Sequence, residues 1–163
     1  MSATEPKVAV LMGSANDWNI MQAASDQLTA LGIANEARVI SAHRTPQRHH
    51  DFVTEQAPAE GVKVFICGAG MAAHLAGVTA ALTSSPVIGV PLESGGMGGM
   101  DSLLSTVQMP GGMPVATVAV GKAGAKNAAI LAAQMLGLGH PEIAERVKDL
   151  RAKQTAGVPE FPG

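Results

Sequence analysis

Short apolar runs recur along the chain, separated by longer segments in which apolar residues lie three and four positions apart. The runs are rich in β-branched residues and end at glycine, proline or polar residues, as strands buried in a parallel sheet do. We therefore predict strands over residues 7–12, 34–40, 62–67, 86–90 and 114–120.

The segments between these runs have the periodicity of helices with one buried face. In the first of them, Met21, Ala24, Leu28 and Leu31 share a face, and Gly32 ends the helix. We predict helices from the 13–18 corner to residue 31 and over residues 46–56, 75–82, 101–108, 123–136 and 141–156, with Asp101 as the cap of the fourth.

Strands that alternate with helices predict an α/β fold, in which three layers include a central parallel sheet of about five strands. The chain, residues 1–163, is expected to form one domain: a core over about 7–140, an extra C-terminal helix over about 141–156 and a short tail over 157–163. The helix over 123–136 is apolar almost all round, so we expect oligomerisation to cover one of its surfaces.

The composition of the chain indicates which kinds of molecule it is expected to bind. The chain has 163 residues, of which 47% are apolar, enough for a substantial core. The 11 Lys and Arg residues are balanced by 13 Asp and Glu residues without a basic run, so we expect no nucleic acid or membrane partner and favour a small molecule. The single cysteine, Cys67, excludes an internal disulfide and a cysteine-based metal site, and we expect it to be buried.

The first residues, 1–7, include Glu5 and Lys7 and carry no apolar stretch of the kind that a secretion signal needs. No run reaches the roughly 18 apolar residues of a membrane helix. We therefore expect a soluble, cytoplasmic protein.

Polar or glycine-rich corners follow three of the predicted strands, over residues 13–17, 41–44 and 68–74. Because the carboxyl ends of parallel strands meet at one edge of a sheet, these corners are expected to converge on one pocket. The second corner carries His43 and Arg44 side by side and leads into Thr45-Pro46, an N-cap followed by a first helical residue.

The first two corners together have the chemistry of a phosphoribosyl site. Ser14 offers a hydroxyl at a helix start and Arg44 a planar cation, and both suit a phosphate. Asp17 suits the paired hydroxyls of a ribose. The alternative is that Ser14 and Asp17 form only a capping box, in which a serine is followed by an acid three residues on.

His43 is the candidate proton carrier, because the ordinary pKa of an imidazole, about 6.5, lies close to neutral pH. The alternative is that His43 is only a loop residue, whose imidazole is hydrogen-bonded to the backbone. We expect the adjacent His49 and His50 to be solvated residues on a helix surface. No two histidines have the i, i+4 spacing with a glutamate that is typical of zinc sites, so no metal is expected.

The third corner begins with Gly68-Ala69-Gly70-Met71-Ala72-Ala73, which has the G-x-G-x-x-A form of a dinucleotide fingerprint. It lies on the third strand, however, and the nearest acid, Glu93, stands beyond Pro91. The glycines are better explained by a close approach of the backbone to a flat ring. His74 either touches the ligand or caps the loop, and residues 95–99 are expected to form a mobile loop.

These motifs resemble the class I 5-(carboxyamino)imidazole ribonucleotide mutases, over residues from about 7 to 155. The sequence departs from the family pattern at Asn16, where serine is expected, at Ala76, where proline is expected, and at Met71, which is often glycine. The matching blocks are Gly13-Ser14 with Asp17-Trp18, the highly specific Ser41-Ala42-His43-Arg44-Thr45-Pro46, Gly68-Ala69-Gly70 with Ala72-Ala73-His74-Leu75, Asp101-Ser102-Leu103-Leu104 and Val107-Gln108-Met109-Pro110-Gly111-Gly112.

The resemblance implies a flavodoxin-like fold and a step of de novo purine synthesis. In that step a carboxyl group moves from the exocyclic nitrogen of an aminoimidazole ribonucleotide to carbon 4 of the ring, without metal or organic cofactor. The resemblance also implies a homo-octamer with sites at subunit junctions, in which the last helix reaches a neighbour. By resemblance, His43 carries the proton, and the substrate-binding residues are Gly13, Ser14, Asn16, Asp17, Ser41, Ala42, Arg44, Gly68, Ala69, Gly70, Ala73, His74 and Leu75.

Other functions also fit this fold. One is an aminoimidazole ribonucleotide carboxylase that takes free carbon dioxide, in which a Ser-Asn pair is expected where Ala72-Ala73-His74 stands. Another is a flavodoxin-like module that binds flavin or a dinucleotide without catalysis, which is disfavoured because the chain has no Tyr and only Trp18 near a corner. A protein that uses the fold only for interactions would not need the intact corner residues.

Overall fold

Five parallel strands form one sheet in the order β2-β1-β3-β4-β5. The computed structural model describes residues 6–161. Residues 1–5, which belong to the segment where we expected no secretion signal, and residues 162–163 of the predicted tail lie outside it. This order is that of a flavodoxin-like sheet, and the predicted three-layer α/β fold is confirmed. The strands are β1 Lys7–Met12, β2 Ala34–Val39, β3 Val62–Gly70, β4 Val87–Leu92 and β5 Ala116–Thr117.

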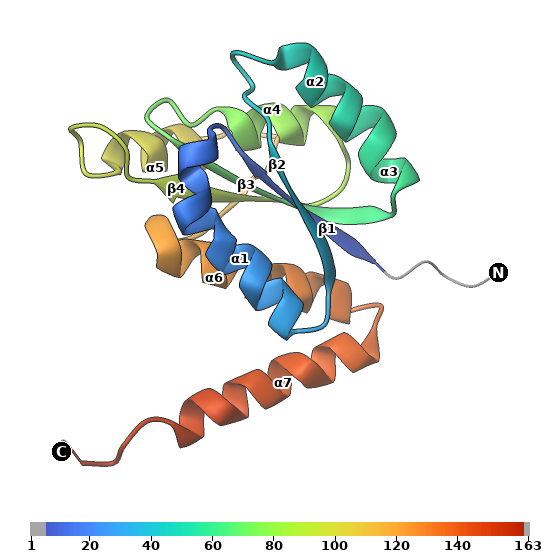
Figure 1. Cartoon of the computed structure of the whole chain (residues 1–163), viewed down its shortest axis with the longest axis vertical. Helices are drawn as coiled ribbons and strands as arrows, with labels where there is room; N and C mark the ends of the chain where they lie inside the picture. Colours follow the sequence, from blue (N-terminus) through green and yellow to red (C-terminus); the bar gives the residue numbers. More distant parts are fainter. Residues whose placement is uncertain (1–5, 162–163) are drawn as a thin grey trace.

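Helices cover both faces of the sheet (Figure 1). On one face α1 and α6 pack against side chains such as Val8 and Val10, and on the other the helices after β2 and β3 pack against Ala9 and Leu11. The alternation of these neighbours along β1 follows from the two-residue period of a strand. The helical segments are η1 Ala15–Asp17, α1 Trp18–Ala30, α2 Pro46–Asp51, η2 Phe52–Gln56, α3 Ala57–Ala59, α4 Leu75–Leu82, α5 Met100–Val107, α6 Gly121–Gly137 and α7 Pro141–Ala156.

The apolar helix α6 is covered largely by its own chain. Five of its six alanines are completely buried against the sheet and α1, namely Ala125, Ala128, Ala129, Ala132 and Ala133. Helix α7 packs on α6 and buries Ile143 and Val147 in the same core. The cover beyond the sheet that this helix was expected to need, and that we assigned to oligomerisation, is therefore supplied largely by α1 and α7 of the same chain. None of the helices within residues 6–161 combines the length and the apolar character that a bilayer crossing requires.

Several strand boundaries differ from the sequence-based ones. β2 is an edge strand whose residues are partly exposed, although it was predicted to be buried. β3 continues to Gly70, within the segment predicted to be a loop, and β4 continues through Pro91 to Leu92. β5 is much shorter than predicted and pairs only with Ile88 and Gly89, so the β5 side of β4 is open at Pro91. A residue without an N–H is tolerated on such an open side.

The helix after β2 continues past its predicted end at residue 56. It widens into a π-helical turn over η2, where the N–H of Ala57 bonds to the carbonyl of Phe52, and then accommodates Pro58. Helix α5 starts two residues earlier than predicted, because its N-cap is Gly99 and not Asp101; Gly99 lies in the left-handed region, φ 81°. Asp101 therefore lies inside the first turn, where its carboxylate accepts a hydrogen bond from the amide of Ser102.

Candidate functional site

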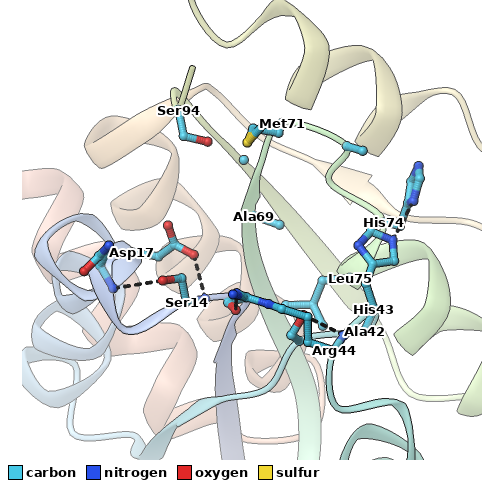
Figure 2. A pocket seen from close by; sticks show the side chains of 15 residues that line it. Ser14, Asp17, Ala42, His43, Arg44, Ala69, Met71, His74, Leu75 and Ser94 are labelled. Carbon is cyan, nitrogen blue, oxygen red and sulfur yellow. Dashed lines mark hydrogen bonds between the residues drawn. The ribbon is translucent and has the colours of Figure 1, made fainter.

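The loops that follow β1, β2, β3 and β4 surround a cavity of about 500 Å³ at the carboxyl edge of the sheet (Figure 2). The three predicted corners therefore converge on one pocket. Of the predicted site residues, all but Gly68 and Ala73 line it. Met71, Ala72 and Ser94 also line it, although they were not among the predicted site residues. Ser94 stands just after the end of a buried strand, and that position is the signal that could have identified it.

Two histidines from different loops meet in this pocket. Nε2 of His43, from the loop between β2 and α2, lies 2.9 Å from Nδ1 of His74, from the turn between β3 and α4. Their rings are nearly perpendicular, at 89°, with centroids 5.0 Å apart. Both side chains are exposed to the pocket, so the pair can reach a ligand and exchange a proton with it. His74 is therefore bonded to the predicted proton carrier.

Arg44 links the first two corners. Its backbone amide bonds to the hydroxyl of Ser41 at 3.1 Å, which fixes the turn, and its Nη2 donates to the carbonyl of Gly13 at 3.1 Å. Figure 2 shows the guanidinium extending from the side of His43 towards Ser14. None of the ion pairs within residues 6–161 involves Arg44, so its charge is available to an anionic ligand.

Ser14 and Asp17 form the capping box that was the alternative to a ligand role. The amide of Ser14 donates to Oδ2 of Asp17 at 3.0 Å, and the hydroxyl oxygen of Ser14 accepts from the amide of Asn16 at 3.3 Å. The first helical element here is only the three-residue turn η1, before α1 begins at Trp18. The Ser14 hydroxyl keeps its own hydrogen for a ligand, so capping and binding are compatible.

The carboxyl group of Asp17 is held in a partly buried position. Burial raises the pKa of Asp17, while the hydrogen bond from the Ser14 amide and the charge of Arg44 oppose that rise. The carboxyl thus lies beside a cation on the wall of the pocket. This environment suits a group that accepts hydrogen bonds from hydroxyls.

The glycines of the third corner are required by close packing and not by a turn. A Cβ atom at Gly68 would overlap the side chain of Met21, and one at Gly70 would overlap the hydroxyl of Ser94. Gly68 does not line the cavity, and its lack of a side chain lets β3 pack closely against Met21. Met71, by contrast, has a left-handed backbone, φ 56°, which is costly for a residue with a Cβ. The glycine that the resemblance led us to expect at this position would avoid this cost.

His49 is buried, so the prediction that it is solvated is wrong, whereas His50 is exposed as predicted. Nε2 of His49 lies 2.8 Å from the Thr79 hydroxyl, which donates to the carbonyl of Leu75 at the start of α4. Burial, and to a smaller extent the charge of His50, lowers the pKa of His49. This bond connects α2 to α4.

Cys67 is buried as predicted, and burial raises the pKa of its thiol to about 12. Thr45 occupies the predicted N-cap position, but its hydroxyl bonds back to Ser41 and does not cap the helix. Within residues 6–161, no group of three or more His, Cys, Asp or Glu side chains lies close enough together to hold a metal ion.

Comparisons of the sequence with family models and with known proteins agree on one family. The model of the AIR carboxylase family matches residues 7–157. The N5-carboxyaminoimidazole ribonucleotide mutase of Brucella melitensis is 54% identical over 155 residues, which cover 95% of each chain. The mutase of the same name from Saccharolobus solfataricus is 57% identical over 143 residues, covering 88% of this chain and 89% of the relative.

Solved structures with a similar fold support the same family assignment. A crystal structure of Treponema denticola PurE superimposes with a TM-score of 0.85 at 30% identity, covering 93% of both chains. A crystal structure of a variant of Treponema denticola PurE2 has the same TM-score at 29% identity, covering 94% of this chain and 93% of the other. The resemblance inferred from the sequence motifs is therefore confirmed, and the chain belongs to the AIR carboxylase family.

Proposed function

We propose that this protein is a 5-(carboxyamino)imidazole ribonucleotide mutase, acting in purine synthesis. The observation that carries the proposal is the His43–His74 pair, which faces a pocket that also presents Arg44 and Asp17. Curated relatives that are 50–57% identical over most of the chain include several that bear this activity as their name.

The ribonucleotide is expected to bind across the first two corners. Arg44 has guanidinium donors beyond those bonded to Gly13 and Ser41, and these suit the oxygens of a phosphate. The free hydrogen of the Ser14 hydroxyl adds a second donor. Asp17 would repel a phosphate, so it is assigned to the ribose hydroxyls. The imidazole base then lies towards His43 and the third corner.

The chemistry needs one proton to be given and one to be taken. Transfer of a proton from His43 to the carbamate nitrogen makes that nitrogen a leaving group, and the C–N bond breaks to release carbon dioxide. Carbon 4 of the electron-rich ring then attacks this carbon dioxide. His43 removes the proton from carbon 4, which restores the aromatic ring and returns the imidazole to its starting state. General acid–base catalysis of this kind contributes about 10²–10⁴-fold.

Carbon dioxide must stay beside the ring between the two bond changes. The third corner supplies a wall of small residues, Ala69, Gly70 and Ala72, that leaves room for it next to the histidine pair. Because the released molecule reacts before it diffuses away, the second step has the advantage of proximity.

The decisive experiment supplies purified protein with the carbamate ribonucleotide in buffer purged of carbon dioxide, with the carbamate carbon labelled. A mutase forms the carbon-4 carboxylate and keeps the label. The alternative function, a carboxylase, requires the uncarboxylated ribonucleotide with added carbon dioxide, and the name of the family model keeps this alternative in view. Turnover only under the second condition would reject the mutase.

A flavin-binding module is the less favoured alternative. Among the described residues that line the pocket there is no Phe, Tyr or Trp to stack on a flavin ring. A visible absorption spectrum of the purified protein tests this directly, because bound flavin is yellow.

Assembly into a homo-octamer, in the cytoplasm, is part of the same proposal. The second half of α7, from Arg151 onwards, is exposed throughout, so it is available to a neighbouring subunit. Helix α5 also exposes Met100, Leu104 and Val107 along one side. Light scattering of the purified protein should give about eight times the chain mass of 16.5 kDa.

A further inference from the structure

The segment that carries His74 has little support of its own. It begins at Met71, whose backbone is left-handed, and continues through Ala72 and Ala73 to the start of α4. Ala73 is 1% exposed, so its amide hydrogen cannot bond to solvent. A buried amide in an irregular segment needs a partner from elsewhere in the molecule.

That partner is Ser105, on helix α5. The amide of Ala73 donates to the hydroxyl oxygen of Ser105 at 2.9 Å. The hydroxyl has one hydrogen, and its shortest acceptor is the carbonyl of Asp101, one helical turn earlier, at 2.7 Å. The carbonyls of Met71 and Ser102 are farther away, both at 3.3 Å. The hydroxyl is therefore oriented by its own helix, with a lone pair facing the amide of Ala73.

We propose that Ser105 is a positioning residue, whose hydroxyl holds the 71–74 segment so that His74 stays bonded to His43. Ala73 and His74 are adjacent, so a shift of the Ala73 amide moves the imidazole that lies 2.9 Å from Nε2 of His43. The hydrogen bond between the rings depends steeply on distance and angle. Ser105 lies outside the pocket lining and does not touch the reacting atoms. Its effect on turnover rests on the proposed mutase function, whereas its effect on the histidine pair does not.

The test compares Ser105→Ala, Ser105→Thr and a matched control, Ser102→Ala. Threonine keeps the hydroxyl and in helices can make the same bond to the carbonyl four residues earlier. Ser102 is a buried serine of the same helix that bonds to Leu92 and Gly99 and not to the 71–74 segment. Each variant is measured for kcat and KM with the carbamate ribonucleotide, and a crystal structure gives its distance between His43 and His74.

For Ser105→Ala we expect kcat to fall by about 10–100-fold with little change in KM, as for a catalytic group displaced by about an ångström. Its imidazoles should separate beyond hydrogen-bonding distance. Ser105→Thr should have the wild-type kcat and the wild-type distance between the two imidazoles. Ser102→Ala should change neither kcat nor this distance. An intact histidine pair in Ser105→Ala, or an equal loss of kcat in Ser102→Ala, would overturn the proposal.

Two further outcomes are covered by the same design. If Ser105→Ala does not fold, Ser105→Cys, which keeps a side chain of similar shape with a weaker acceptor, is judged by the same two criteria. If the wild-type chain does not convert the carbamate at all, the proposed function fails, and the crystal structures still decide the role of Ser105.

Discussion

Nε2 of His43 and Nδ1 of His74 are 2.9 Å apart, although the residues belong to loops that follow different strands. When both imidazoles are neutral, one ring nitrogen must donate the hydrogen and the other must accept it. The pair therefore has two arrangements of its protons that share one geometry. Donation of a proton to a ligand starts instead from a pair that carries one additional proton and leaves the neutral pair, and the return of the proton restores the first state without movement of the backbone.

Replacement of His43 by asparagine should leave the protein folded and able to bind ribonucleotide but reduce kcat by about 10²–10⁴-fold, because the general acid and base is lost. Steady-state kinetics and calorimetric binding measure the two effects separately. His50→Asn is the matched control, since His50 is exposed and does not line the pocket. Near-normal turnover in His43→Asn would remove this residue from the mechanism.

Replacement of Arg44 by alanine should weaken ribonucleotide binding by roughly 10–100-fold, as expected for a lost charge-assisted hydrogen bond of about 1.5–3 kcal/mol. The loss should be smaller for the nucleoside, which lacks the phosphate. Arg48→Ala serves as the control, because Arg48 is exposed on α2 outside the pocket. Equal losses for nucleotide and nucleoside would place the phosphate elsewhere.

His49 should make the protein less stable as the pH falls below about 6.5, the ordinary pKa of histidine. Its pKa is lowered in the folded protein by burial, so the unfolded chain binds its proton first. The stabilisation from neutral His49 is thus complete above that pH and is lost as the pH falls towards the folded-state pKa, with a slope of at most about 1.4 kcal/mol per pH unit. Urea unfolding of wild type and His49→Gln between about pH 7.5 and 5.5 measures the difference.

The wild-type free energy of unfolding should fall more steeply with acid than that of His49→Gln. His50→Asn should retain most of the wild-type slope, because burial is the larger cause of the lowered pKa of His49 and the charge of His50 is the smaller one. If the free energy of unfolding depends on pH in the same way for wild type and His49→Gln, the pKa of His49 does not differ between the folded and the unfolded chain.

The left-handed backbone at Met71 predicts a reversal of the usual order of alanine and glycine. Met71→Gly should be more stable than Met71→Ala by about 1–2 kcal/mol, since only alanine pays for the positive φ. At Asn127, an exposed position inside α6, glycine should instead be less stable than alanine by about 1 kcal/mol. Thermal or urea unfolding of the four variants tests both signs, and a lower stability for Met71→Gly than for Met71→Ala would contradict the assigned conformation.

The layers and the strand and helix order could be predicted from the sequence, because apolar periodicity reflects burial directly. The ends of strands could not. Gly68 and Gly70 indicate a loop when only local preference is considered, but here they lie in a central strand whose neighbours, Met21 and Ser94, leave no space for a side chain. Pro91 likewise indicates a break, and only the short pairing of β5 explains why the strand continues.

The pocket could be predicted because three corners end neighbouring strands, whereas contacts between distant segments could not. The bond between Ala73 and Ser105 joins residues that no local pattern relates. The burial of His49 could have been predicted from the sequence. His49 lies three and four positions before Phe52 and Val53, which are both buried, and so shares their face of the helix.

Trp18, the first residue of α1, is the only tryptophan of a chain that has no tyrosine, and in the sequence it directly follows Asp17, which lines the pocket. Its indole packs partly against the core. Intrinsic fluorescence excited near the red edge of protein absorption therefore comes from this corner alone. Because Trp18 adjoins Asp17 in the chain, we expect a nucleotide bound at Asp17 to change the emission of this indole, so that the unlabelled wild-type protein reports its own occupancy.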